Sequence, residues 1–176
     1  MEGRSGKNRM YTVNPVERLA ALGCDVIINI AASPFAHNHE TIKSSILSDI
    51  AGTYKLPIIY VNQVGAQAEL IFDGVSRVLN VSGQTVERLA SFKEDFLCFD
   101  LDNINSAKIY KHNNSDNNPV EIIYDALELG IHDYFEKTNF KTAILGLSGG
   151  IDSAVTLVIA KSALGAENVR VLLMPS

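Results

Sequence analysis

The sequence predicts an α/β protein, and three patterns support that prediction. Short runs rich in β-branched residues, such as DVIINIA at 25–31 and PIIYVNQ at 57–63, are typical of buried strands. Segments with helical spacing of apolar residues lie between these runs. Residues 119–174 then follow the order helix, strand, helix, strand, which predicts a parallel sheet with right-handed crossovers.

In the first part of the chain, we expect helices at 16–22 and 39–54, the second because isoleucines and a tyrosine recur every four residues. The strands at 25–31 and 57–63 are expected to be buried on both faces. Turns at Asp73-Gly74 and Ser82-Gly83 separate shorter runs of strand character. These shorter strands are predicted at 69–72, 76–80, 85–90 and 95–100.

A change of composition marks a predicted domain boundary. Residues 103–118 contain six asparagines and no sustained apolar period, which is typical of a linker. Asn118 is a suitable N-cap and Pro119 a suitable first helical residue. We therefore expect one domain at 1–102, a linker at 103–118 and a second domain at 119–176. The second domain is predicted to hold strands at 142–147 and 169–174 around a helix at 153–164.

The composition of the chain limits the classes of partner that it is suited to bind. The 176 residues are 47% hydrophobic and carry a net charge of −5. An acidic chain is poorly suited to nucleic acid or to an anionic membrane as its main partner. No apolar run approaches the length of a membrane span, and the polar start has no apolar core of a signal peptide. Two cysteines without a metal-type spacing fit a cytoplasmic protein with reduced thiols.

The stretch AILGLSGGIDSAVT, at 143–156, has the pattern of a phosphate-binding turn. Gly149 and Gly150 let the backbone approach an anion, and the following helix presents unpaired N–H groups. Ser148 and Ser153 add hydroxyl groups. A carboxylate at Asp152 repels a polyphosphate unless a cation lies between them, and Mg²⁺ prefers such oxygen ligands.

The alternative for this turn is an ordinary helix cap, since Asp, Ser and Gly are common at that position. The whole string S-G-G-x-D-S between a buried strand and an apolar helix favours the phosphate site. No Gly-Lys-Ser/Thr follows, so it is not a Walker A loop. It also lacks G-x-G-x-x-G, which disfavours a nicotinamide Rossmann site.

SGGIDS resembles the ATP loop of the N-type ATP pyrophosphatases, which split ATP into AMP and pyrophosphate. PVEIIYDALELGIHDY, GLSGGIDSAVT and VRVLLMPS together resemble NAD synthetases. Upstream, CDVIINIAASPF, LPIIYVNQVG and ELIFDGVSRVLNVSGQTV resemble the second half of a nitrilase-type glutaminase. The combination resembles the glutamine-dependent NAD synthetases. It implies the C-terminal half of a nitrilase-like α/β sandwich, followed by the start of a doubly wound ATP pyrophosphatase domain.

The resemblance implies a ligase that amidates deamido-NAD. ATP adenylates the nicotinate carboxylate, and ammonia from glutamine displaces AMP to give NAD. Asp152 matches a magnesium ligand. Leu173 and Met174 match a strand end near the adenine, although strand packing is an equally supported interpretation of their side chains. The residues implied to bind ATP are Gly146, Leu147, Ser148, Gly149, Gly150, Ile151, Asp152, Ser153, Leu173 and Met174.

For the glutaminase half, the resemblance implies that Ser33 contacts glutamine. His39 stands where the family usually has Lys or Arg to bind the substrate carboxylate. A histidine near its ordinary pKa is mostly neutral at pH 7, so it is a weaker and pH-dependent partner. A solvent-exposed position at the start of a helix is the alternative for His39. A metal pair formed by His37 and His39 is disfavoured, because no third ligand accompanies it.

Nitrilase-type glutaminases use a Cys nucleophile, a Glu base and a Lys, and none of these is matched here. The cysteine is expected upstream of Asp25, at or before MEGRSGKNRM, which contains none. Cys24 and Cys98 are predicted to be packing residues. We therefore expect a central piece of a longer, homo-oligomeric enzyme, inactive as a glutaminase by itself. Two alternatives stay open: another SGGxDS-loop amidating ligase or tRNA-modifying enzyme, and a non-catalytic assembly role.

Overall fold

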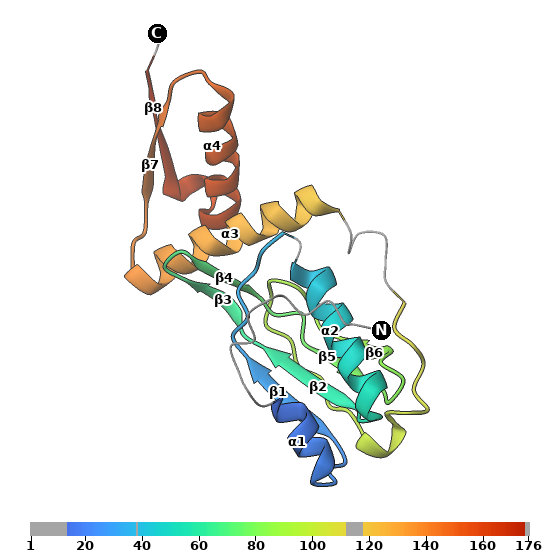
Figure 1. Ribbon diagram of the computed structural model, residues 1–176. Coiled ribbons are helices and arrows are strands. Elements are labelled where there is room, and N and C mark those ends of the chain that lie inside the picture. The colour runs from blue at the N-terminus through green and yellow to red at the C-terminus, as the bar shows by residue number, and fades with distance from the viewer. Residues whose placement is uncertain (1–13, 38, 112–117, 175–176) are drawn as a thin grey trace.

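The computed structural model describes residues 14–37, 39–111 and 118–174. Helices and strands alternate in the first and last parts, and five successive strands lie between residues 58 and 88; this mixture confirms the α/β class (Figure 1). The helices are α1 (Pro15–Ala21), α2 (His39–Tyr54), α3 (Pro119–Thr138), α4 (Ile151–Leu164) and the short 3-10 helices η1 (Leu101–Asn103) and η3 (Ala166–Asn168). The strands are β1 (Ile27–Ala31), β2 (Ile58–Asn62), β3 (Val64–Gln67), β4 (Leu70–Asp73), β5 (Arg77–Leu79), β6 (Thr85–Arg88), β7 (Ala143–Leu147) and β8 (Val169–Leu173).

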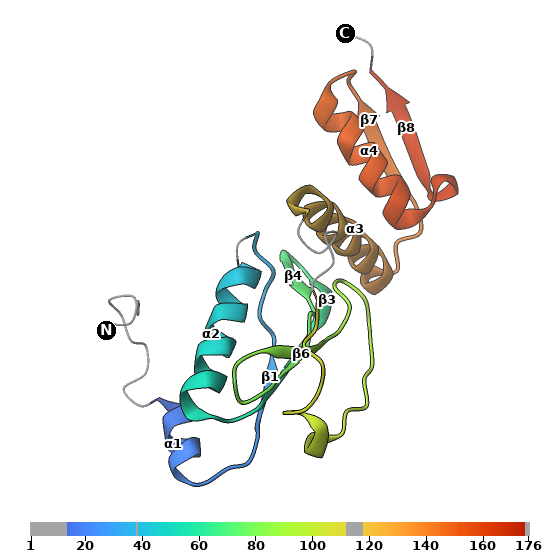
Figure 2. The same cartoon turned by 90° about the vertical axis from the view of Figure 1, so that its right-hand side faces the viewer.

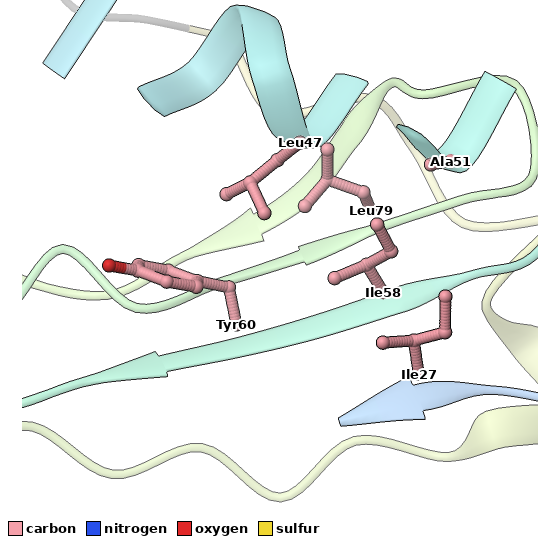
Figure 3. Packing of buried hydrophobic residues seen from close by; sticks show 6 residues of the cluster. All are labelled: Ile27, Leu47, Ala51, Ile58, Tyr60 and Leu79. Carbon is pink, nitrogen blue, oxygen red and sulfur yellow. The ribbon is translucent and has the colours of Figure 1, made fainter. Parts of the chain in front are cut away.

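The first part of the chain forms a four-stranded sheet in the order β1-β2-β5-β6. Strands β1 and β2 are parallel, while β5 pairs antiparallel with both β2 and β6. Helix α2 covers one face of this sheet, and the main core lies between them (Figure 3). Burial of this apolar surface is the main stabilising term of the layer. The buried core residues are Ile27, Leu47, Ala51, Ile58, Tyr60 and Leu79.

The prediction that β1 is buried on both faces is wrong. Ile27 is buried under α2, but Ile28 and Ile30 on the opposite face are 62% and 81% exposed. Strand β1 lies at the edge of the sheet, and α2 packs on one face only. The second strand, β2, also leaves Val61 exposed. A continuous apolar run therefore indicated a strand correctly but overstated its burial.

Helix α2 forms where it was predicted, but of its regularly spaced isoleucines only Ile50 packs against the core. Leu47 and Ala51 face the sheet, whereas Ile42 and Ile46 are 54% and 52% exposed. Positions 47 and 51 are also four residues apart, so the same period fits either stripe. Tertiary packing against β2 and β5, rather than the period alone, selects the buried face.

Residues 95–100 do not form the predicted strand. The Asp95 carboxylate instead accepts the backbone N–H groups of Ala90 and Phe96, at 2.9 and 2.8 Å. These bonds hold the chain in an irregular turn, and the Phe96 side chain is 87% exposed. Conversely, strand β3 was not predicted; it pairs antiparallel with β4 as a hairpin.

The last part of the chain forms α3, β7, α4 and β8 as predicted. The Asn118 side chain accepts the Val120 N–H at 3.2 Å and caps α3, with Pro119 as its first residue. Strands β7 and β8 pair in parallel over five positions. Helix α3 lies between α4 and the β3–β4 hairpin and contacts both (Figures 1 and 2). It therefore links the first part of the chain to the unit formed by β7, α4 and β8.

The proposed domain boundary at 102–103 stays a prediction. Within the described part of the linker, Ile104 is 2% exposed and packs with Val78 and Val86. The chain thus keeps contact with the first sheet for some residues after 102. Residues 112–117 of the linker lie outside the described residues. None of the described helices is long and apolar enough to cross a membrane.

Candidate functional sites

The candidate nucleotide loop connects the end of β7 to the start of α4. Leu147 ends the strand, and Gly150 is the N-cap of a helix that begins at Ile151, two residues earlier than predicted. The helix is 14 residues long, and its dipole places partial positive charge at the loop. Gly150 has no side chain to cap the first N–H groups, so they remain available to an anion.

Gly149 gives the loop its shape. Its φ of +83° lies in the left-handed region, which side chains with a Cβ rarely adopt. Apart from the residues next to it in the chain, no atom lies within 4 Å of the place where a Cβ would be, so the loop is open on that side. Both observations suit a backbone that a phosphate approaches closely.

Two hydroxyl groups border the loop. The oxygens of Ser148 and Ser153 lie 3.4 Å apart, and Ser153 also donates to the Gly150 carbonyl at 2.8 Å. The Ser153 hydroxyl therefore stabilises the turn itself. The Ser148 side chain is exposed, and its hydroxyl oxygen lies 3.5 Å from where a Cβ on Gly150 would be.

The end of β8 lies beside the loop. Leu173 pairs with Leu147, and the Met174 N–H donates to the Leu147 carbonyl at 3.0 Å. The Met174 methyl group lies 2.6 Å from where a Cβ on Gly146 would be. All ten residues predicted to bind ATP thus gather at the carboxyl ends of two parallel strands, the usual place for ligands in such sheets. Their binding role stays a prediction.

Asp152 is exposed in the first turn of α4, and its carbonyl accepts the Thr156 hydroxyl at 2.8 Å. An exposed carboxylate in the first turn of this helix fits a hard cation that it would share with the oxygens of a bound phosphate. Asp152 therefore fits the predicted magnesium site, and no other carboxylate lies within the segment 146–153.

Ser33, the predicted glutamine contact, lies in the segment that follows β1. Its backbone N–H donates to the Asn62 Oδ1 at 2.8 Å, and its carbonyl accepts the Asn62 Nδ2 at 3.4 Å. Asn62 was not among the predicted site residues. The sequence could have indicated it, because it is a polar residue at the end of a strand, in a position where the alternation of buried and exposed side chains predicts burial.

His39 is exposed at the first turn of α2, where its N–H donates to the Ala36 carbonyl at 2.8 Å. This location agrees with the alternative interpretation of His39, a solvent-exposed position at the start of a helix. A contact between His39 and glutamine stays a prediction. A cavity of about 360 Å³ opens nearby and includes Phe35, His37, Glu40 and Asp73 in its lining.

Charged side chains are buried behind the Ser33 segment. Lys43 pairs with Asp73 at 3.3 Å, and the fully buried Arg77 guanidinium pairs with Glu40. Burial raises the pKa of Tyr60, an effect partly offset by the nearby Ser33 hydroxyl, so this phenol stays neutral at physiological pH. Each ion pair offsets part of the free-energy cost of removing its charged groups from water.

The prediction that both cysteines are packing residues is confirmed for Cys24 and is wrong for Cys98. Cys24 is half-buried and packs against the main core, whereas Cys98 is exposed in the irregular segment after β6. Residues 1–13, at or before which the nucleophile is expected, lie outside the described residues. Among those described, His132, Asp133 and Glu136 bring potential metal ligands within 4.8 Å of one another. The Asp133 carboxylate, however, is already bonded to Ala66 and Lys137.

The strand, glycine turn and helix at 143–164 define an α/β protein with an open glycine turn at a helix N-terminus. Residues 123–176 match the family described as NAD synthase. The chain is 41% identical over 172 residues to the glutamine-dependent NAD(+) synthetase of Synechocystis, covering 96% of this chain and 30% of that protein. It is 34% identical to the enzyme of the same name from Acinetobacter baylyi, covering 94% and 31%.

Among solved structures, the chain resembles a glutamine-dependent NAD+ synthetase from Acinetobacter baumannii in complex with ADP. The identity is 40%, the TM-score is 0.83, and 91% of this chain and 30% of that one are covered. A Cytophaga hutchinsonii enzyme of the same name shares the fold, with a TM-score of 0.66 at 20% identity. The chain is therefore homologous to a segment of the glutamine-dependent NAD(+) synthetases, as its motifs predicted. It spans about 30% of the length of the curated relatives it matches.

Proposed function

We propose that this chain acts in glutamine-dependent NAD(+) synthesis, as the part that holds the ATP loop and a section of the glutamine site. In this reaction ATP adenylates the nicotinate carboxylate of deamido-NAD, and ammonia from glutamine displaces AMP. The products are NAD, AMP, pyrophosphate and glutamate. One observation carries the proposal: an open glycine turn at a helix N-terminus lies inside the stretch that matches the NAD synthase family.

The loop residues bind the phosphates of ATP in this proposal. The N–H groups at the start of α4 and the Ser148 hydroxyl donate to phosphate oxygens, and the open side of Gly149 admits them. Asp152 would hold Mg²⁺ together with these oxygens. When bound, the ion would neutralise negative charge on the phosphates, including the charge that develops on the leaving pyrophosphate.

The strand ends place the adenine in this proposal. Leu173 and Met174 lie next to Leu147 at the edge of the loop, with the Met174 side chain across Gly146. An exposed methionine at this position supplies a polarisable apolar surface for an aromatic base. The relative from A. baumannii was solved with ADP, which supports an adenine nucleotide as the ligand.

Glutamine is the proposed ligand of the other site, at Ser33 and His39. The relatives are named as glutamine-dependent, and the sequence motif around Ser33 supports the same role here. With ATP, deamido-NAD and glutamine as partners, all the proposed ligands are small molecules. The negative net charge agrees with a function away from nucleic acid.

Mapping by NMR tests the proposal directly on the 176-residue protein. Titration with ATP and Mg²⁺ should shift the amide signals of Gly149, Gly150 and Ser153 and leave that of Ser33 unchanged. Titration with glutamine should do the reverse. Nucleotide-dependent shifts spread over α2 and β1, with none in the loop, would contradict the assignment.

A further inference from the structure

The Ser33 segment is fixed by a side chain from the next strand of the sheet. Asn62, the last residue of β2, bonds both backbone groups of Ser33, accepting from its N–H at 2.8 Å and donating to its carbonyl at 3.4 Å. The Asn62 side chain therefore replaces the strand pairing that ends at Ala31. Two bonds to one residue set both the position and the rotation of its peptide groups.

Asn62 is itself held by a buried ion pair. Its Nδ2 donates to the Asp73 Oδ1 at 3.0 Å, and that carboxylate is paired with the Lys43 ammonium at 3.3 Å. Asn62 and Asp73 are 7% and 4% exposed. Because Asp73 accepts from Nδ2, the amide orientation is fixed, and Oδ1 must face the Ser33 N–H.

The neighbouring residues are tied to the same scaffold. Pro34 bridges to Phe72 in β4, and the Phe35 N–H donates to the Ile71 carbonyl at 2.7 Å. Strand β4 also supplies Asp73. The segment 33–35 is therefore bound along its length to the end of β2 and to β4, with little freedom to adjust when a ligand arrives.

We propose that Asn62, oriented by Asp73 and Lys43, is the positioning residue of the glutamine site and holds Ser33 in the geometry that contacts glutamine. This inference rests on the proposed function, because it takes glutamine as the ligand of Ser33. Asn62 acts through the Ser33 backbone and does not itself touch the substrate. The buried Asp73–Lys43 pair prevents the Asn62 amide from flipping, which would place Nδ2 instead of Oδ1 opposite the Ser33 N–H.

The test compares Asn62→Leu with the unchanged protein in two measurements. Hydrogen exchange followed by NMR reports the Ser33 amide, which should exchange at least about tenfold faster once Oδ1 is lost. Glutamine titration followed by saturation transfer should show at least about tenfold weaker binding. ATP-dependent shifts in the loop at 146–153 should stay unchanged, because that loop lies in the other part of the molecule.

Asn80→Leu is the matched control. Asn80 is 6% exposed, and its side chain also accepts backbone N–H groups, those of Ser82 and Gln84 at 3.0 Å. Its loss should reduce stability similarly without changing Ser33 exchange or glutamine binding. Asn62→Ser, which is too short to bond both Ser33 groups, serves as a second variant if leucine disturbs the fold.

The outcomes separate the inference from the function on which it rests. If the unchanged protein binds glutamine and Asn62→Leu binds it equally well, the positioning role is wrong and the proposed function stands. Equal weakening in Asn62→Leu and Asn80→Leu would also overturn the inference, since it would indicate a general loss of stability. If glutamine fails to perturb Ser33 in the unchanged protein, the glutamine site and the inference fail together. The ATP mapping then still tests the nucleotide loop.

Discussion

The Asp133 carboxylate accepts the backbone N–H of Ala66 at 2.7 Å and so fastens helix α3 to strand β3. Lys137, one turn further along α3, donates to the same carboxylate at 3.0 Å and to the Ala66 carbonyl. Both polar backbone groups of Ala66 are thereby bonded to α3. Since α3 also packs against α4, one helix connects the hairpin of the first part to the helix that follows the candidate nucleotide loop.

Removing this carboxylate should reduce stability. Asp133 is 9% exposed, so Asp133→Ala leaves the Ala66 N–H without its partner in a mostly buried place. We expect the free energy of unfolding to fall by about 2–3 kcal/mol, as for other buried bonds to a charged group. Urea denaturation measures this. Glu136→Ala, at an exposed position on the same helix, is the control and should change stability by less than about 0.5 kcal/mol.

The same carboxylate should make stability depend on pH. Burial alone would raise the pKa of Asp133, but the Ala66 N–H, Lys137 and His132 outweigh it and hold the pKa below its ordinary value. The folded state therefore binds the proton less readily than the unfolded chain. The contribution of Asp133 is fully present above the unfolded pKa of about 3.9 and is lost as pH falls through the lower folded pKa.

Comparing Asp133→Asn with the unchanged protein over this range checks the sign. The stability difference between the two proteins should be constant near neutral pH and shrink as the solution is acidified below about pH 4. A difference that grows on acidification would contradict the direction of the shift.

Gly149→Ala should strain the loop without a clash. Its φ of +83° costs alanine about 1–2 kcal/mol, while the space around the new Cβ is open. We expect a loss of about 1 kcal/mol in stability and weaker ATP binding, because relief of the strain moves the loop. Gly23→Ala is a matched control, with φ +79° and equally open surroundings. It should lose similar stability and keep its ATP affinity.

The chain should not hydrolyse glutamine by itself. Cys24 packs against the core, and Cys98 lies in an exposed irregular segment, so neither has the surroundings of an activated nucleophile. Incubation of the purified 176-residue protein with glutamine should release no glutamate. Release that disappears on thiol alkylation would contradict this prediction, because Cys24 and Cys98 are the only cysteines of the sequence.

Local patterns were sufficient to predict the strand, turn and helix that form the candidate nucleotide loop. The strand, the glycines and the helix at 143–164 are consecutive in sequence, and Asn118 caps α3 through its own neighbours. Contacts distant in sequence were not predictable in this way. Nothing near Ser33 in sequence indicates that Asn62 holds it, or that Asp133 bonds Ala66, because strand order and helix packing bring these residues together.

The predictions of which side chains are buried failed for a related reason. The apolar run at β1 was correctly read as a strand, yet Ile28 and Ile30 are exposed, since burial depends on which element covers a face. In α2, one four-residue period fitted two stripes, and only the sheet beneath decides between them. At 95–100, the Asp95 side chain competed with strand pairing for backbone N–H groups, an effect that alternation of residues does not report.

The magnesium dependence of ATP binding tests the central claim most directly. Calorimetry should detect ATP binding by the 176-residue protein in the presence of Mg²⁺ and much weaker binding with a chelator. In Asp152→Ala this dependence on Mg²⁺ should disappear, whereas Glu121→Ala, an acid in the first turn of α3, should behave as the unchanged protein does. Equal magnesium-dependent affinity in Asp152→Ala would contradict the assignment of Asp152, and a lack of ATP binding under all conditions would contradict the nucleotide loop itself.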